Sequence, residues 1–148
     1  MLKLKIITPE RIMIEAEAES LSLPTDLGEI TILENHIPLV ANLRAGEIKF
    51  KKENSEEFFV VSGGVLEVKP GNEVVVLADT AEFGHEIDVQ RAEEARERAR
   101  KLMSESYKDE KTYAESTALL EKNLARLKVA KKHRTRTHKN LESGSLNE

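Results

Sequence analysis

Four basic side chains on two predicted helices are spaced so that the members of each pair share one helix face. Arg91 and Arg98 lie seven residues apart, which is two turns along one face of a helix. Lys122 and Arg126 are four residues apart and would be neighbours on a second helix. If the two helices fold against each other, the four cations can lie close together and bind an anion. In the alternative interpretation the arginines are solvated, and Asp88 only caps the first helix.

The rest of the sequence shows no pattern that is typical of catalysis or metal binding. It has no HExxH sequence, calcium loop, Walker sequence or recognisable Ser/His/Asp arrangement, and it has no cysteine. Gly63-Gly64 lacks the Lys-Ser/Thr of a phosphate loop and precedes no helical pattern, so it predicts a tight strand reversal. His36 and His85 are isolated in the sequence. We therefore expect no catalytic residue and no metal site, with an active site assembled only by folding as the weaker alternative.

Composition and charge indicate a water-soluble chain in two parts. Charged residues make up 34% of the 148 residues and aromatic residues 4%. No segment approaches the roughly 18 consecutive apolar residues of a membrane helix, and residues 1–5 lack the apolar run of a signal peptide. Any membrane association is therefore expected to be indirect, through partners. Residues 1–84 carry 15 acidic and 8 basic side chains, whereas residues 85–148 carry 12 and 15, which favours different partners for the two parts.

Residues 1–84 have the pattern of an antiparallel β-sandwich. Apolar and polar residues alternate in short segments such as Leu2 to Ile6, and continuous apolar runs occur at 58–61 and 74–77. Turn signals separate these segments, including the Pro70-Gly71-Asn72 sequence. Many short strands with closely spaced turns are typical of a sandwich.

Residues 85–141 have the pattern of an antiparallel two-helix hairpin, so the fold class is α+β. Asp88 and Asp109 are suitable N-caps for the two helices. Apolar or small residues recur at helical spacing in both, at Val89, Ala92, Ala95, Ala99 and Leu102, and at Tyr113, Thr117, Leu120, Leu124 and Leu127. Small residues on one helix would face large ones on the other. Residues 142–148 are expected to be a disordered tail.

Two loops in the sandwich are candidates for recognition. Gly28 can take positive φ, which predicts a tight loop at residues 26–28. Asn35-His36 stands before Ile37-Pro38, which predicts an exposed turn with polar groups. The alternative is that Pro38 shapes an ordinary surface turn.

Two collinear segments resemble the epsilon subunit of bacterial F-type ATP synthase. The first spans 28–46 and includes Gly28-Glu29-Ile30, Asn35-His36 and Pro38-Leu39. The second spans 61–82 and includes Val61-Ser62-Gly63-Gly64-Val65-Leu66-Glu67-Val68 and Val76-Leu77-Ala78-Asp79-Thr80-Ala81-Glu82. The resemblance implies a non-catalytic central-stalk subunit that couples proton-driven rotation of the c-subunit ring to ATP synthesis through gamma. It also implies a peripheral protein on the cytoplasmic face of the bacterial plasma membrane.

The same resemblance assigns expected contacts to the loops. By this carry-over, the Gly28 loop and Glu29 face the c-subunit ring, and His36 lies near the gamma subunit. The C-terminal helices would inhibit ATP hydrolysis by reaching the catalytic alpha and beta subunits.

The sequence Ile87-Asp88-Val89-Gln90-Arg91-Ala92 resembles an ATP-binding motif of some bacterial epsilon subunits. The matching surroundings are Glu82, Arg98, Lys122 and Arg126. Lys122 departs from the Arg of the family's nucleotide binders and loses the bidentate fork of a guanidinium. The resemblance thus implies that ATP could bind as a regulatory ligand. We expect that the protein requires no cofactor.

The basic end of the second helix has three interpretations. It could be a solvated tail, a nucleic-acid patch, or a clamp for acidic surfaces of alpha and beta. A sequence pI of about 5.7 and the lack of interleaved aromatic residues disfavour nucleic acid. The resemblance favours the clamp, with Lys128, Lys131, Lys132, Arg134 and Arg136 as its residues.

A second function is consistent with the same composition. The sandwich could be an unrelated ligand-binding module that uses the helical hairpin to dimerise. Purification in a stoichiometric complex with gamma would favour the stalk subunit, and a homodimer indifferent to gamma would favour the alternative.

Overall fold

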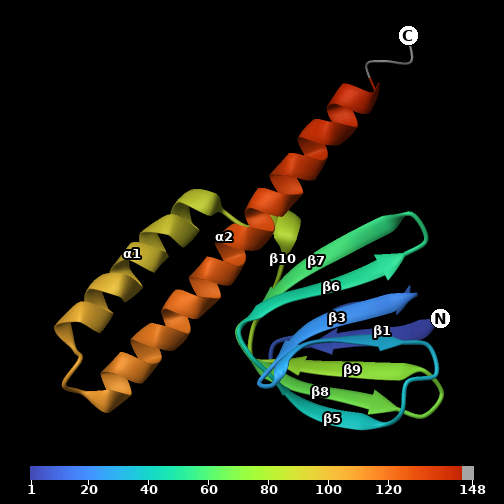
Figure 1. Ribbon diagram of the computed structural model, residues 1–148, viewed down its shortest axis with the longest axis horizontal. Coiled ribbons are helices and arrows are strands. Elements are labelled where there is room, and N and C mark those ends of the chain that lie inside the picture. The colour runs from blue at the N-terminus through green and yellow to red at the C-terminus, as the bar shows by residue number, and fades with distance from the viewer. Residues whose placement is uncertain (145–148) are drawn as a thin grey trace. The chain divides into compact units, whose positions relative to one another are not determined.

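The structure is a computed structural model that describes residues 1–144. It divides into two compact units, Met1–Phe83 and a helical unit that begins at Gly84 (Figure 1). The predicted boundary, between residues 84 and 85, lies one residue from this division. The predicted α+β class, a β-sandwich followed by two helices, is confirmed.

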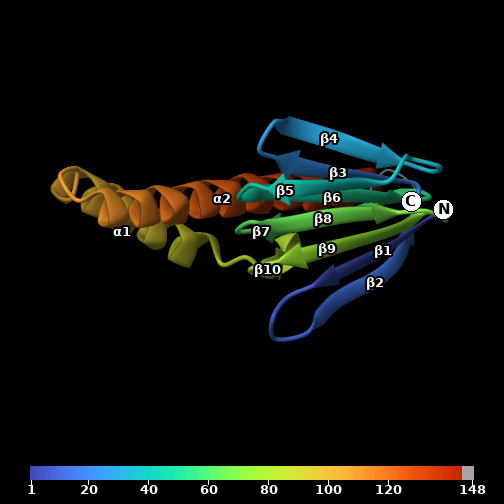
Figure 2. The same ribbon diagram turned by 90° about the horizontal axis from the view of Figure 1, so that it is seen from below.

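The first unit consists of ten short strands (Figures 1 and 2). Their bounds are β1 Leu2–Ile7, β2 Ile12–Ala18, β3 Ser20–Thr25, β4 Gly28–Leu33, β5 Leu39–Leu43, β6 Gly46–Lys52, β7 Ser55–Val61, β8 Gly64–Lys69, β9 Glu73–Ala78 and β10 Ala81–Phe83. They are ordered β10-β7-β6-β3-β5-β8-β9-β1-β2, and β4 pairs with β3. The pairs are antiparallel apart from β1 and β9, which run parallel.

Alternation along the strands produces the core of this unit. In β1, Leu2, Leu4 and Ile6 are buried, whereas the lysines between them point outward. The Phe59 ring stacks on Phe50 at 5.7 Å between centroids. Every member of this buried apolar cluster lies between Leu2 and Ala78, so the core needs no residue of the helical unit.

The prediction of a strand reversal at Gly63-Gly64 was wrong. Strand β7 pairs with β6 and β10, whereas β8 pairs with β5 and β9, so this glycine pair carries the chain between different neighbours. Gly64 has φ of 148°, and a Cβ there would lie 2.1 Å from the carbonyl oxygen of Leu77. Glycine is required at this position by the close approach of β9.

The helical unit consists of a 3₁₀ turn η1 (Gly84–Glu86), helix α1 (Val89–Glu105) and helix α2 (Glu110–Gly144), and α1 packs beside α2 in a hairpin (Figure 1). Both predicted caps are confirmed, since Asp88 accepts the N–H of Arg91 and Asp109 accepts the N–H of Lys111. Helix α2 continues to Gly144, so residues 142–144 prolong the helix instead of starting the predicted tail. The other tail residues, 145–148, lie outside the described residues.

The predicted apolar stripe of α2 was partly wrong. Leu127 is buried, but Tyr113 and Leu124 are exposed. The buried positions include the polar residues Ser116 and Asn123 instead. The Ser116 hydroxyl donates to the carbonyl oxygen of Thr112, and the Asn123 side-chain amide donates to the carbonyl oxygen of Leu119, each one turn earlier. Ala92 and Ala99 are buried on α1, and their small side chains let the two helices approach each other closely. A close approach favours small side chains on α2 as well.

Candidate functional site

The Gly28 loop is a tight, exposed connection between β3 and β4. The Thr25 hydroxyl donates to the carbonyl oxygen of Gly28 at 2.6 Å and accepts the N–H of Leu27 at 3.3 Å. Gly28 has φ of 117°, as predicted for a glycine-dependent loop. Glu29 is exposed, and Leu27 at the tip is 100% exposed. The loop therefore offers one apolar side chain, Leu27, and two acidic side chains, Asp26 and Glu29, to a partner.

The Asn35-His36 turn is closed by a hydrogen bond from the His36 N–H to the carbonyl oxygen of Leu33 at 3.1 Å. His36 is half-buried, and its Nδ1 lies 2.7 Å from the carbonyl oxygen of Ile37. Ile37 is 73% exposed. An apolar side chain thus projects beside the predicted histidine, and the polar loop of the prediction is in fact amphipathic.

An apolar row on the outer face of the sheet was missed by the sequence interpretation. Val65 on β8 stands opposite Leu77 on β9, which stands opposite Ile7 on β1, which stands opposite Ile12 on β2. Val40 on β5 lies on the same face and is 70% exposed, and Leu77 is 52% exposed. Val40 stands opposite Glu67 and not opposite Val65, so the row itself consists of Val65, Leu77, Ile7 and Ile12. Exposed apolar residues gathered on one face are typical of a protein interface. Only the register shows it, because each residue alone resembles a core position.

The four cations of the predicted phosphate site lie on both helices of the hairpin. Arg91 and Arg98 each directly precede a buried alanine of α1, and Lys122 directly precedes the buried Asn123 of α2. Both helices are right-handed and run antiparallel, so residues one position before the inward face lie on the same side of the hairpin. Arg126 is held on that side by Asn123, whose Oδ1 accepts from its Nη1 at 3.0 Å.

The remaining residues of the predicted nucleotide site have structural roles. Asp88 caps α1, Ala92 is buried and Ile87 is half-buried. Glu82 belongs to β10 in the other unit, where it stands opposite Val60. ATP binding by the hairpin stays a prediction.

The predicted clamp residues lie on the C-terminal half of α2, where Lys128 stands between the buried residues Leu127 and Val129. Lys128, Lys131 and Lys132 are exposed. Arg134 and Arg136 follow on the same helix, and their side chains lie outside the described ones. Over the residues that the structure describes, no group of His, Cys, Asp or Glu is arranged to hold a metal ion.

The identity of the chain follows from comparison with known proteins. The ATP synthase delta/epsilon chain beta-sandwich domain matches residues 1–84, and the long alpha-helix domain of the same chain matches residues 85–131. This chain belongs to the ATP synthase delta/epsilon chain family. The resemblance stated from the sequence is confirmed.

Individual relatives agree with this family along most of their length. The ATP synthase epsilon chain of Dehalococcoides mccartyi is 47% identical over 133 residues, which cover 90% of this chain and 94% of the relative. The epsilon chain of Moorella thermoacetica is 44% identical over 87% of this chain and 96% of the relative. These relatives span both units of the delta/epsilon fold.

Solved structures show the same fold. A chain of the Euglena gracilis mitochondrial ATP synthase, in a structure of OSCP, F1 and the c-ring, superposes with a TM-score of 0.75 at 23% identity. The superposition covers 84% of this chain and 78% of that one. Within residues 1–144 of this delta/epsilon chain, no helix is both long and apolar enough to cross a membrane.

Proposed function

We propose that this chain is the non-catalytic epsilon subunit of a bacterial F-type ATP synthase, docked on the gamma subunit and the c-subunit ring. In that role it couples proton-driven rotation of the ring to ATP synthesis. It would be a peripheral protein on the cytoplasmic face of the plasma membrane, attached only through the complex. The family supports membership in the synthase, and the exposed apolar row on the sandwich supports docking.

The apolar row is the observation that carries the proposal. Leu77 is 52% exposed in a row that also contains Val65, Ile7 and Ile12, and Val40 on the same face is 70% exposed. Burial of apolar surface is worth about 25 cal/mol per Å², so a partner that covers the row gains substantial free energy. The gamma subunit is the partner proposed for this face.

The two loops are proposed to extend the contact. Gly28 and Glu29, with the fully exposed Leu27, would face the c-subunit ring. His36, beside the exposed Ile37, would lie near gamma. Both loops are stabilised by hydrogen bonds within the sandwich, so the contact geometry is formed before docking.

The helical unit is proposed to inhibit ATP hydrolysis. The basic residues from Lys128 onward would contact acidic surfaces of the alpha and beta subunits, with Lys131, Lys132, Arg134 and Arg136 as the main clamp. A regulatory ATP, bound by Arg91, Arg98, Lys122 and Arg126, would favour the folded hairpin and so oppose the clamp. No other cofactor is required by this mechanism.

Reconstitution tests the proposal. Purified alpha, beta and gamma are combined with the full chain or with a chain that ends at Glu86, and ATP hydrolysis is measured in both complexes. We expect stoichiometric incorporation of both chains and slower hydrolysis only with the full chain. A stable homodimer that does not bind gamma would contradict the proposal and support the ligand-binding alternative.

A further inference from the structure

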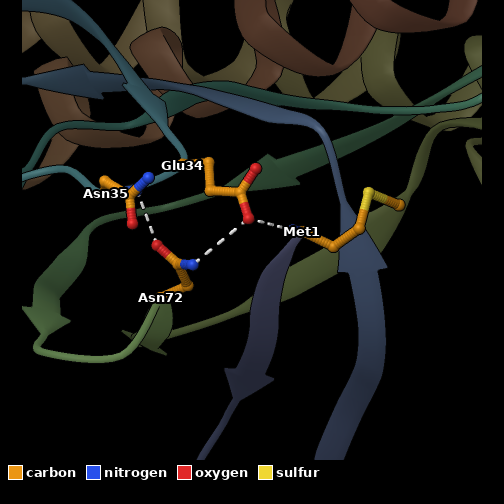
Figure 3. A network of polar contacts seen from close by, with 4 residues as sticks. All are labelled: Met1, Glu34, Asn35 and Asn72. Atoms are coloured by element: carbon orange, nitrogen blue, oxygen red, sulfur yellow. Dashed lines mark hydrogen bonds and ion pairs between the residues drawn. The ribbon is translucent and has the colours of Figure 1, made fainter.

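Asn72 links two loops that are distant in the sequence. Its Oδ1 accepts the backbone N–H of Asn35 at 2.6 Å, and its Nδ2 donates to Oε1 of Glu34 at 3.4 Å (Figure 3). The same carboxylate of Glu34 lies 2.7 Å from the amino group of Met1. One side chain in the β8–β9 turn therefore holds both residues that precede His36.

The backbone of Asn72 is itself fixed to the sheet. Its carbonyl oxygen accepts the N–H of Lys3 at 2.7 Å, which ties the turn to β1. Gly71 and Asn72 have φ of 84° and 65°, so the turn needs two successive residues that tolerate the left-handed region. Because the Asn72 backbone is fixed to β1, its side chain holds the contacted loop at a fixed position relative to the sheet.

The Asn35 turn depends on that contact. Asn35 also has positive φ, 61°, a conformation that costs free energy for a residue with a Cβ. Its N–H would have no hydrogen-bond partner in the turn without the Asn72 carbonyl group, because the turn's own closing bond uses the His36 N–H. The Asn72 side chain is thus the feature that favours this turn over other conformations of the loop.

We propose that Asn72 is a positioning residue, which fixes the Asn35-His36 turn in the conformation that docks on the rotor. The docking part of this inference rests on the proposed function. The positioning part does not, since it concerns contacts within the sandwich. Asn72 acts through the turn and need not touch a partner.

Hydrogen exchange of the Asn35 amide tests the positioning, and binding to the purified gamma subunit with the c-subunit ring tests its consequence. Asn72→Gly keeps the left-handed backbone and removes only the side chain. Loss of one ordinary hydrogen bond should increase exchange at Asn35 about three- to tenfold and weaken binding by a similar factor. Glu53→Gly is the matched control and should change neither quantity, because Glu53 also has positive φ, 49°, and lies in the β6–β7 turn.

A swap of the two polar groups provides the rescue. In Glu34→Gln/Asn72→Asp the amide and the carboxylate exchange places, so an acceptor for the Asn35 N–H is kept without two neighbouring negative charges. We expect this double variant to restore slow exchange at Asn35 and binding to the rotor. If the Asn72 substitution instead disrupted the turn itself, the double variant would restore neither. Melting temperatures of all variants establish that the sandwich stays folded.

Two results would overturn the inference. Unchanged exchange at Asn35 in Asn72→Gly would show that the side chain does not hold the turn. Faster exchange with unchanged binding, while His36→Glu weakens binding, would show that docking does not need the turn to be held. If the unmodified chain fails to bind the rotor at all, the proposed function fails, and exchange at Asn35 alone decides whether Asn72 positions the turn.

Discussion

The carboxylate of Asp88 accepts the backbone N–H of Arg91, with 3.1 Å between Oδ1 and N. The two charged residues of the proposed ATP motif are therefore bonded to each other at the first turn of α1. The bond satisfies a backbone donor that the helix leaves unpaired, which accounts for Asp88 without a ligand. It also fixes where the Arg91 side chain leaves the helix.

ATP binding should require cations from both helices. Arg91→Ala and Arg126→Ala should each abolish the heat seen on calorimetric titration of the full chain with ATP, because each removes one of the cations that must converge around the triphosphate, together with its bidentate hydrogen bonds. Arg100→Ala is the control, since that side chain contacts Glu97 at 3.6 Å and is not in the proposed set. No heat from the unmodified chain at millimolar ATP would leave Asp88 as a helix cap.

Leu77 on the outer face of the sandwich should matter for docking and not for folding. Leu77→Gln should weaken binding to gamma about tenfold or more, which corresponds to about 1.4 kcal/mol, because a polar amide enters the proposed apolar contact. The sandwich should lose less than about 0.5 kcal/mol of stability, as is usual for an exposed position. Leu119→Gln changes a similarly exposed leucine on α2 and serves as control. Equal binding by both variants would argue against this face as the interface.

The sequence predicted the elements better than their faces. Alternation at Leu2, Leu4 and Ile6 identifies an inward face directly, and Asp88 and Asp109 mark both helix starts through cap chemistry. The face of α2 could not be predicted from apolar spacing, because the close approach of Ala92 and Ala99 depends on tertiary packing.

The outer apolar row shows the same limit in the sandwich. Val65 and Leu77 look like core residues until the pairing of β8 with β9 puts them opposite each other and outside. Which residues share such a face depends on the register of strands that are distant in the sequence, and this register could not be derived from the sequence alone. The Asn72 contact with Asn35 joins residues 37 positions apart and was missed for the same reason.

The Asp109 carboxylate should titrate low because it caps α2. The Thr112 hydroxyl, followed by the Thr112 and Lys111 backbone groups, lowers the pKa of Asp109 below 3.8. The stability that the ionised Asp109 cap gives to the folded state is therefore fully present above the unfolded-state pKa of about 3.8. It is lost as the pH falls through the lower folded-state pKa. Nuclear magnetic resonance titration should show this midpoint, and Thr112→Val should raise it. Thr117→Val, a control one turn further on, should leave the midpoint unchanged.

The sandwich should fold without the helical unit. Its buried cluster lies wholly between Leu2 and Ala78, so a chain that ends at Glu86 retains every core contact. We expect a single cooperative thermal transition, and Leu66→Ala should lower stability by about 2–5 kcal/mol because that side chain is fully buried. A broad, non-cooperative transition in the shortened chain would place the domain boundary elsewhere.

The basic part of α2 is suited to act by many weak contacts. Six Lys or Arg residues lie between Lys128 and Lys139 with no acidic residue among them. Successive positions on a helix turn by about 100°, so charges at these sequence spacings are expected over more than one face. Each exposed ion pair is worth only about 0.2–1 kcal/mol, and salt weakens it.

Inhibition by this segment should therefore respond to summed charge. Single substitutions should change hydrolysis little, whereas reversal of Lys131, Lys132, Arg134 and Arg136 together should release much of the inhibition in the reconstituted complex. Higher ionic strength should have the same effect on the unmodified chain. Removal of residues 142–148, which lack this basic pattern, is the control and should leave inhibition unchanged. If the fourfold reversal leaves hydrolysis inhibited while deletion of the helical unit relieves it, inhibition depends on apolar side chains such as Leu124 instead.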